Sequence, residues 1–86
     1  MNNIAEALSV LIANRDEFER IGELKDYEEQ GYQSAPYLHQ ACGLSLTDML
    51  ARVIATQPED QKPEDQKRDA GVIRWCNEQL AKENLQ

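Results

Sequence analysis

Basic side chains are scarce in this 86-residue chain. Nine lysines and arginines stand against 16 aspartates and glutamates, which gives a formal net charge of −7. Proteins bind the phosphate backbone of nucleic acids through Lys and Arg, which displace counterions. Anionic membrane surfaces attract basic segments for the same reason. The composition therefore predicts no direct nucleic-acid partner and no membrane partner.

Long apolar runs are also absent. The longest mostly apolar run, from Ala7 to Ala13, is much shorter than the ~20 residues that cross a bilayer. No basic segment precedes it and Glu6 interrupts it, which is unlike a secretory signal peptide. We therefore expect a cytoplasmic protein. In that compartment Cys42 and Cys76 are expected to be free thiols, although a single disulfide between them is compatible with the sequence.

Strand-forming patterns are missing. The chain has one Phe and one Trp, and its Val and Ile residues do not alternate with polar residues over the length of a strand. The chain is also short enough that a single domain with a thin core is expected. We predict an all-α fold, a compact bundle of four to five short helices that forms one domain over residues 1–86.

Two helices are predicted in the first third of the chain. They run from about Asn3 to Ala13 and from about Asp16 to Gln30, and Gly31 ends the second. The first carries an apolar stripe formed by Ile4, Leu8, Leu11 and Ile12. The second carries a stripe formed by Phe18, Ile21 and Leu24, which points roughly 120° away if the helix is continuous. Burial of both stripes against one core therefore requires a break, which we place at residues 14–16, with Asn14 as a left-handed cap and Asp16 with Glu19 as a capping box.

Three further helices are predicted after a loop at residues 31–36. A short helix runs from about Pro36 to Ala41 and ends at Gly43, and a second, opened by the cap Ser45, runs from about Leu46 to Gln57. The tandem repeat PEDQK-PEDQK at residues 58–67 is expected to be an exposed connection. The last helix is expected from about Glu64 to Asn84. Its predicted core stripe is Ile73, Cys76 and Leu80, with Val72 and Trp75 on the flank.

Acidic side chains recur at spacings of three and four residues in the second predicted helix. They are Asp16, Glu19, Glu23 and Asp26, and they fall opposite the apolar stripe of that helix. A solvated helix face explains this pattern without any function. A ridge that docks on a basic partner surface also explains it, and such a row of carboxylates resembles a row of phosphates in its charge. Like charges four residues apart, such as Glu19 and Glu23, are mildly destabilising, which slightly favours a function.

All the tyrosines of the chain lie within eleven residues, at Tyr27, Tyr32 and Tyr37. Tyrosine buries a large area at little cost in side-chain entropy and is enriched at binding hot spots. The tyrosines therefore form a second candidate contact surface, and covering a corner between two helices is the plainer explanation. Trp75 is expected to pack in the core, with a partner or dimer contact as the alternative.

Catalytic and metal-binding patterns are weak. His39 and Cys42 share one helix face, but zinc sites combine two close pairs of ligands and only one such pair is present. Phosphate-binding loops and hydrolase motifs are absent from the sequence. Residues 36–53 approximate the apolar spacing of a helix-turn-helix, but Arg52 is the only base of the would-be recognition helix. The sequence predicts no enzyme, no cofactor and no metal.

The features together favour a non-catalytic protein that binds another protein. We expect an inhibitor or sequestering factor that docks its acidic helix face and its tyrosines on a basic partner surface. Small size and acidity are typical of proteins with which phages and mobile elements inhibit host or defence machinery. An antitoxin or immunity protein is the alternative, followed by a helix-turn-helix regulator. Homodimerisation is compatible with the wide apolar arc of the last helix.

Overall fold

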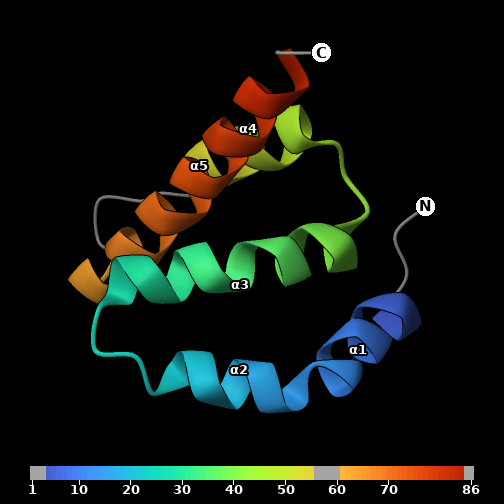
Figure 1. The fold of residues 1–86 in the computed structure, drawn as a ribbon, viewed down its shortest axis with the longest axis vertical. Helices are drawn as coiled ribbons and strands as arrows, with labels where there is room; N and C mark the ends of the chain where they lie inside the picture. Colours follow the sequence, from blue (N-terminus) through green and yellow to red (C-terminus); the bar gives the residue numbers. More distant parts are fainter. Residues whose placement is uncertain (1–3, 56–60, 85–86) are drawn as a thin grey trace.

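The protein is a bundle of helices. A computed structural model describes residues 4–55 and 61–84, and these ranges contain the helices α1 (Ile4–Ala13), α2 (Arg15–Gly22), α3 (Tyr27–Cys42), α4 (Leu46–Ala55) and α5 (Pro63–Asn84) and no strand. The predicted all-α class is therefore confirmed. Helix α3 is central, because it contacts α1 and α2 on one side and α5 and α4 on the other (Figure 1). None of the helices in these ranges is long and apolar enough to cross a membrane.

The predicted break between the first two helices is confirmed, although its local chemistry differs. Helix α1 ends at Ala13, and the side-chain amide of Asn14 donates a hydrogen bond of 2.8 Å to the carbonyl of Val10. Asn14 has φ −115°, so the predicted left-handed cap is wrong. The predicted capping box is also wrong, because Asn14 occupies the N-cap of α2 and makes no side-chain capping bond there.

The predicted second helix, from Asp16 to Gln30, is wrong at its C-terminal half. Helix α2 ends at Gly22, and Asp26 begins a new helix by accepting hydrogen bonds on Oδ1 from the backbone N–H groups of Glu28 (3.0 Å) and Glu29 (3.4 Å). These bonds satisfy N–H groups that have no partner within the helix. Helix α3 then continues through Gly31 and Pro36 to Cys42. The predicted loop at residues 31–36 and the predicted short helix from Pro36 to Ala41 are therefore wrong.

Two buried glycines explain why α3 continues where a stop is predicted. A Cβ atom on Gly31 would lie 1.8 Å from the backbone carbonyl oxygen of Arg68 in α5. A Cβ atom on Gly71 of α5 would lie 2.0 Å from the carbonyl oxygen of Glu28 in α3. The two backbones are thus in direct contact at this crossing, which only glycine permits on each side. Tertiary packing therefore outweighs the intrinsic preference of Gly31 to end a helix.

The other predicted helix boundaries agree with the structure where they are described. Gly43 ends α3 with φ 67°, and the Ser45 hydroxyl accepts a hydrogen bond of 3.1 Å from the backbone N–H of Asp48 to begin α4. Pro63 is the first residue of α5, so the whole second PEDQK copy at residues 63–67 is helical, and the predicted connection over residues 58–67 is wrong for this half. The predicted end of the fourth helix at Gln57 and the start of the repeat fall at residues 56–60, outside the described residues.

The core is small and lies between α3, α4 and α5. Its buried residues are Ala35, Met49, Val72 and Cys76. Cys76 belongs to the predicted stripe of α5, but Val72, predicted on the flank, is buried and Ile73 and Leu80 are only half-buried. The face of α5 that packs is therefore rotated toward Val72, because Gly71 sets the contact with α3.

The apolar stripe of α1 is not buried in this chain, contrary to expectation. Ile4 is 79 % exposed, Ile12 74 %, Leu8 50 % and Leu11 41 %. By contrast, Ile21 of α2 is buried, and Phe18 and Leu24 are half-buried. Helix α1 contacts α3 but neither α4 nor α5 in the described ranges, which leaves its apolar residues beside the core instead of in it.

Candidate functional site

Helix α2 lies at one edge of the molecule (Figure 1), and the side chains of Asp16, Glu19 and Glu23 are exposed. Asp16, Glu19 and Glu23 lie within an arc of about 60° around the helix axis. Glu23 directly follows α2 and keeps helical backbone angles. The predicted ridge is therefore present for these three residues, which we call the acidic face.

The carboxylates of the acidic face take no part in the ion pairs of the described residues. Within residues 4–55 and 61–84, the ion pairs join Glu17 to Arg20, Asp65 to Arg68, and Glu28 and Glu29 to Arg74. None of these pairs involves Asp16, Glu19 or Glu23. The Arg20 guanidinium lowers the pKa of the Glu17 carboxyl through its hydrogen bond, whereas Arg20 makes no ion pair with the acidic face. The negative charge of α2 is thus concentrated on its outward side.

Asp26, the fourth predicted member of the ridge, has a different role. Its carboxylate receives the backbone N–H groups of Glu28 and Glu29 and caps α3. It lies after the end of α2 and does not share one helix with Asp16. The structure therefore divides the predicted ridge into three free carboxylates and one capping carboxylate.

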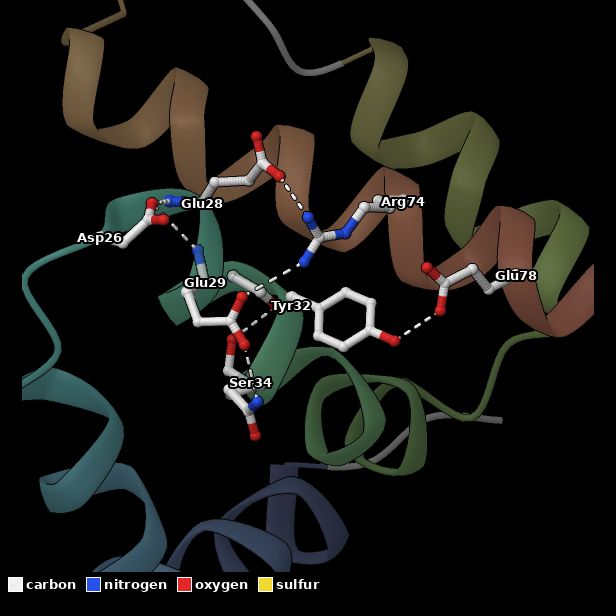
Figure 2. A network of polar contacts seen from close by, with 9 residues as sticks. Asp26, Glu28, Glu29, Tyr32, Ser34, Arg74 and Glu78 are labelled. Carbon is white, nitrogen blue, oxygen red and sulfur yellow. Dashed lines mark hydrogen bonds and ion pairs between the residues drawn. The ribbon is translucent and has the colours of Figure 1, made fainter.

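Tyr32 is held between two helices. Its hydroxyl donates a hydrogen bond to Glu78 of α5, and the guanidinium of Arg74 lies 4.3 Å from the centre of its ring (Figure 2). Arg74 also binds Glu28 at 2.6 Å and Glu29 at 3.3 Å. These groups are around 40 % exposed, and pairs at such positions contribute about 0–1 kcal/mol each. The network orients α5 on α3, while the close glycine crossing carries more of the packing.

The other two tyrosines also contact neighbouring helices. Tyr27 lies under the guanidinium of Arg68, 5.0 Å from the ring centre. Tyr37 packs against Phe18 of α2 with ring centres 5.5 Å apart, and its hydroxyl donates a long hydrogen bond of 3.4 Å to Glu17. Tyr27 and Tyr32 thus connect α3 to α5, whereas Tyr37 connects α3 to α2.

The contact between Tyr32 and Glu78 predicts a pH effect. The hydrogen bond to Glu78 raises the pKa of Tyr32 above its ordinary value of 10.0. A raised pKa in the folded state means that this contact contributes fully below the unfolded pKa and is lost as the pH rises through the folded pKa. In a tyrosinate absorbance titration we expect one tyrosine to ionise at higher pH than the others.

Two variants test whether the tyrosine that ionises at higher pH is Tyr32. Tyr32→Phe should remove it, and Glu78→Gln should move it to lower pH while leaving three titrating tyrosines. A wild-type curve in which all tyrosines ionise together would contradict the predicted contact.

Trp75 is half-buried in α5 and packs against His39 of α3, with ring centres 5.7 Å apart. His39 Nε2 is buried and makes no hydrogen bond with the described residues. The thiol of Cys42 donates to the carbonyl of His39 at 3.3 Å, which is a bond within one helix. The described residues contain no cluster of three or more His, Cys, Asp or Glu side chains placed to hold a metal ion.

The two thiols are free and differ in environment. Cys76 is fully buried and Cys42 is half-buried. Burial raises the pKa of the Cys76 thiol, so it remains protonated and unreactive at neutral pH.

An open apolar groove was missed by the sequence reasoning. It has a volume of about 470 Å³, and it is lined by α1, by the C-terminal half of α3, and by α4 and α5. Nine of its eleven lining residues are apolar, and the charged ones are Arg52 and Asp69. A sequence signal for it exists, because residues 30–47 contain no Asp, Glu, Lys or Arg. The absence of charge in this stretch indicates an apolar region, but it does not tell which helices line the groove.

No family model, curated protein or solved structure matches this chain.

Proposed function

We propose that this protein binds a basic surface of another protein through the acidic face of α2 and that it acts without catalysis. The observation that carries the proposal is the set of exposed carboxylates at Asp16, Glu19 and Glu23, which have no ion-pair partner among the described residues. Complementary charge steers two proteins together and fixes the orientation of docking.

The arrangement of arginines supports this assignment. Arg20, Arg68 and Arg74 each neutralise carboxylates elsewhere, including Glu17 on α2 itself. A merely solvated helix would gain stability from such pairs on every side. Because the acidic face of α2 is not neutralised, its charge remains available to a partner. A row of carboxylates is also compatible with mimicry of phosphates.

The proposed biochemical role is inhibition or sequestration of the partner. Phages and mobile elements use small acidic proteins in this way against host or defence machinery, and antitoxins and immunity proteins neutralise their targets by the same physical means. The tyrosines that we expected to join this surface instead make contacts within the chain. We therefore assign the leading role to the acidic face and a supporting one to Tyr37, which contacts α2.

Charge reversal of the acidic face tests the proposal. The double variant Glu19→Lys with Glu23→Lys should weaken partner capture at least tenfold, which is about 1.4 kcal/mol. Capture is measured by affinity purification from cells that naturally express the chain, followed by mass spectrometry and titration of the partner identified. Capture by the native chain should also fall as salt is raised.

The matched control carries the same change in net charge at another place. Asp48→Lys with Glu83→Lys alters two exposed carboxylates on α4 and α5 and should leave capture unchanged. If both double variants lose the partner equally, bulk charge is responsible and the acidic face is not the docking site. If neither loses it, binding uses a different surface.

A further inference from the structure

One face of the protein is almost free of charge. Residues 4–14 carry a single charged side chain, Glu6, and residues 30–47 contain no Asp, Glu, Lys or Arg. Helix α1 packs on α3, so these two stretches lie together in the structure. In a chain with a net charge of −7, this is the face on which two copies repel each other least.

A ridge of apolar side chains stands on that face. Ile4, Leu8 and Ile12 recur every four residues along α1, so they project from one side of the helix. They are 79 %, 50 % and 74 % exposed. Contiguous exposed apolar residues on a small protein mark an interaction surface, whereas single ones do not.

The apolar groove lies beside the ridge on the same helix. Leu11 of α1 lines the groove together with Leu38 and Cys42 of α3 and Met49 of α4. One side of α1 is therefore a projecting ridge, and the adjacent side is a wall of the groove. A surface that carries both a projection and a depression can pair with itself about a two-fold axis.

We propose that this face binds a second copy of the chain. In the resulting dimer, the Ile4–Leu8–Ile12 ridge of each copy enters the groove of the other. The charged residues that line the groove are of opposite sign and make no ion pair with each other in one chain. A two-fold arrangement lets Arg52 of each copy pair with Asp69 of the other, which gives the contact charge complementarity as well as apolar area.

The acidic face takes no part in this contact. Its carboxylates lie on α2 and line no part of the groove. The dimer therefore presents two acidic faces, which raises the effective concentration for a partner with repeated basic sites. Dimerisation does not depend on the proposed function, and each can fail without the other.

The experiment measures the mass of the native chain in solution by light scattering and by sedimentation velocity over about 1 to 100 µM. We expect twice the monomer mass of 9.8 kDa at the upper end of this range. Leu8→Glu with Ile12→Glu should convert the dimer to a monomer at every concentration. Because both side chains are exposed in the single chain, helical circular dichroism should be unchanged.

Ile54→Glu is the matched control, because Ile54 is 56 % exposed on α4 and lines neither the ridge nor the groove. It should leave the dimer intact. A native chain that is monomeric throughout overturns the proposal, as does a dimer that survives the α1 double variant. The α1 variant should still capture the basic partner, so loss of the dimer and loss of the proposed function remain distinguishable.

Discussion

Gly31→Ala is expected to lower the free energy of unfolding by about 3 kcal/mol or more, the largest effect that we expect from a single substitution. The new Cβ would lie 1.8 Å from the carbonyl oxygen of Arg68 and 2.6 Å from its carbonyl carbon. Both are backbone atoms inside a helix, so they cannot turn aside as a side chain does. Relief of the clash requires α3 and α5 to separate, which opens the packing of the most extensive helix pair.

Gly71→Ala should behave in the same way, because its Cβ would lie 2.0 Å from the carbonyl oxygen of Glu28. Urea unfolding followed by circular dichroism measures both effects. The sign of the change in unfolding free energy is informative, because a Gly-to-Ala substitution in a helix otherwise stabilises the protein by about 1 kcal/mol through helix propensity. A loss of stability must therefore come from the crossing.

Gly22→Ala is the matched control. Gly22 is the last residue of α2, its φ is negative, and a Cβ there would meet nothing within 4 Å. The free energy of unfolding of the Gly22→Ala variant should stay the same or rise by up to about 1 kcal/mol. If Gly31→Ala proves as stable as Gly22→Ala, the two helices do not cross at these glycines.

Gln30→Ala is expected to cost about 2 to 3 kcal/mol of stability. Gln30 is only 7 % exposed. Its side-chain amide donates to the carbonyl of Leu24 at 2.6 Å, and its oxygen accepts from Arg68 Nε at 2.8 Å. One side chain thus joins the segment after α2 to both α3 and α5. Its removal leaves a carbonyl and a guanidinium without these partners in a half-buried place, and unsatisfied groups of this kind are costly.

Gln40→Ala provides the comparison within the same helix. Gln40 is exposed on α3, and its substitution should change the unfolding free energy by no more than about 0.5 kcal/mol. Both variants are measured by urea unfolding at one pH and salt concentration. Equal stability of the two variants would show that the Gln30 bonds contribute nothing beyond what water supplies.

The two proposed surfaces use different physical forces. The acidic face of α2 offers uncompensated charge, whose contribution weakens with salt. The α1 ridge and its groove offer apolar area, whose contribution does not weaken in this way. Salt dependence therefore separates the two contacts experimentally, with partner capture falling and self-association persisting as the salt concentration increases.

Local chemistry was sufficient for several elements of the fold. The clash between two apolar stripes required the break near Asn14, and the structure has it there. Ser45 begins α4, Gly43 ends α3, and Pro63 begins α5, because caps and proline act within one turn of the chain. The exposed acidic residues of α2 also follow from periodicity, since they lie opposite Ile21.

The errors around α3 have two physical sources, a local cap and a distant contact. Gly31 and Pro36 are helix breakers by local preference, yet both lie inside α3. A capping interaction at Asp26, which was assigned to the acidic ridge, starts the helix that contains them. The gain that keeps Gly31 helical comes from α5, about forty residues away in the sequence.

The sequence by itself determined that this protein is helical, acidic and unevenly charged, because propensity, caps and charge are properties of neighbouring residues. Only the tertiary structure decided that α3 is one continuous helix, that Gly31 and Gly71 meet, and that Ile4, Leu8 and Ile12 remain exposed. These outcomes depend on which helices come into contact. A local sequence pattern contains no information on the energy of a contact with a helix that is distant in the sequence.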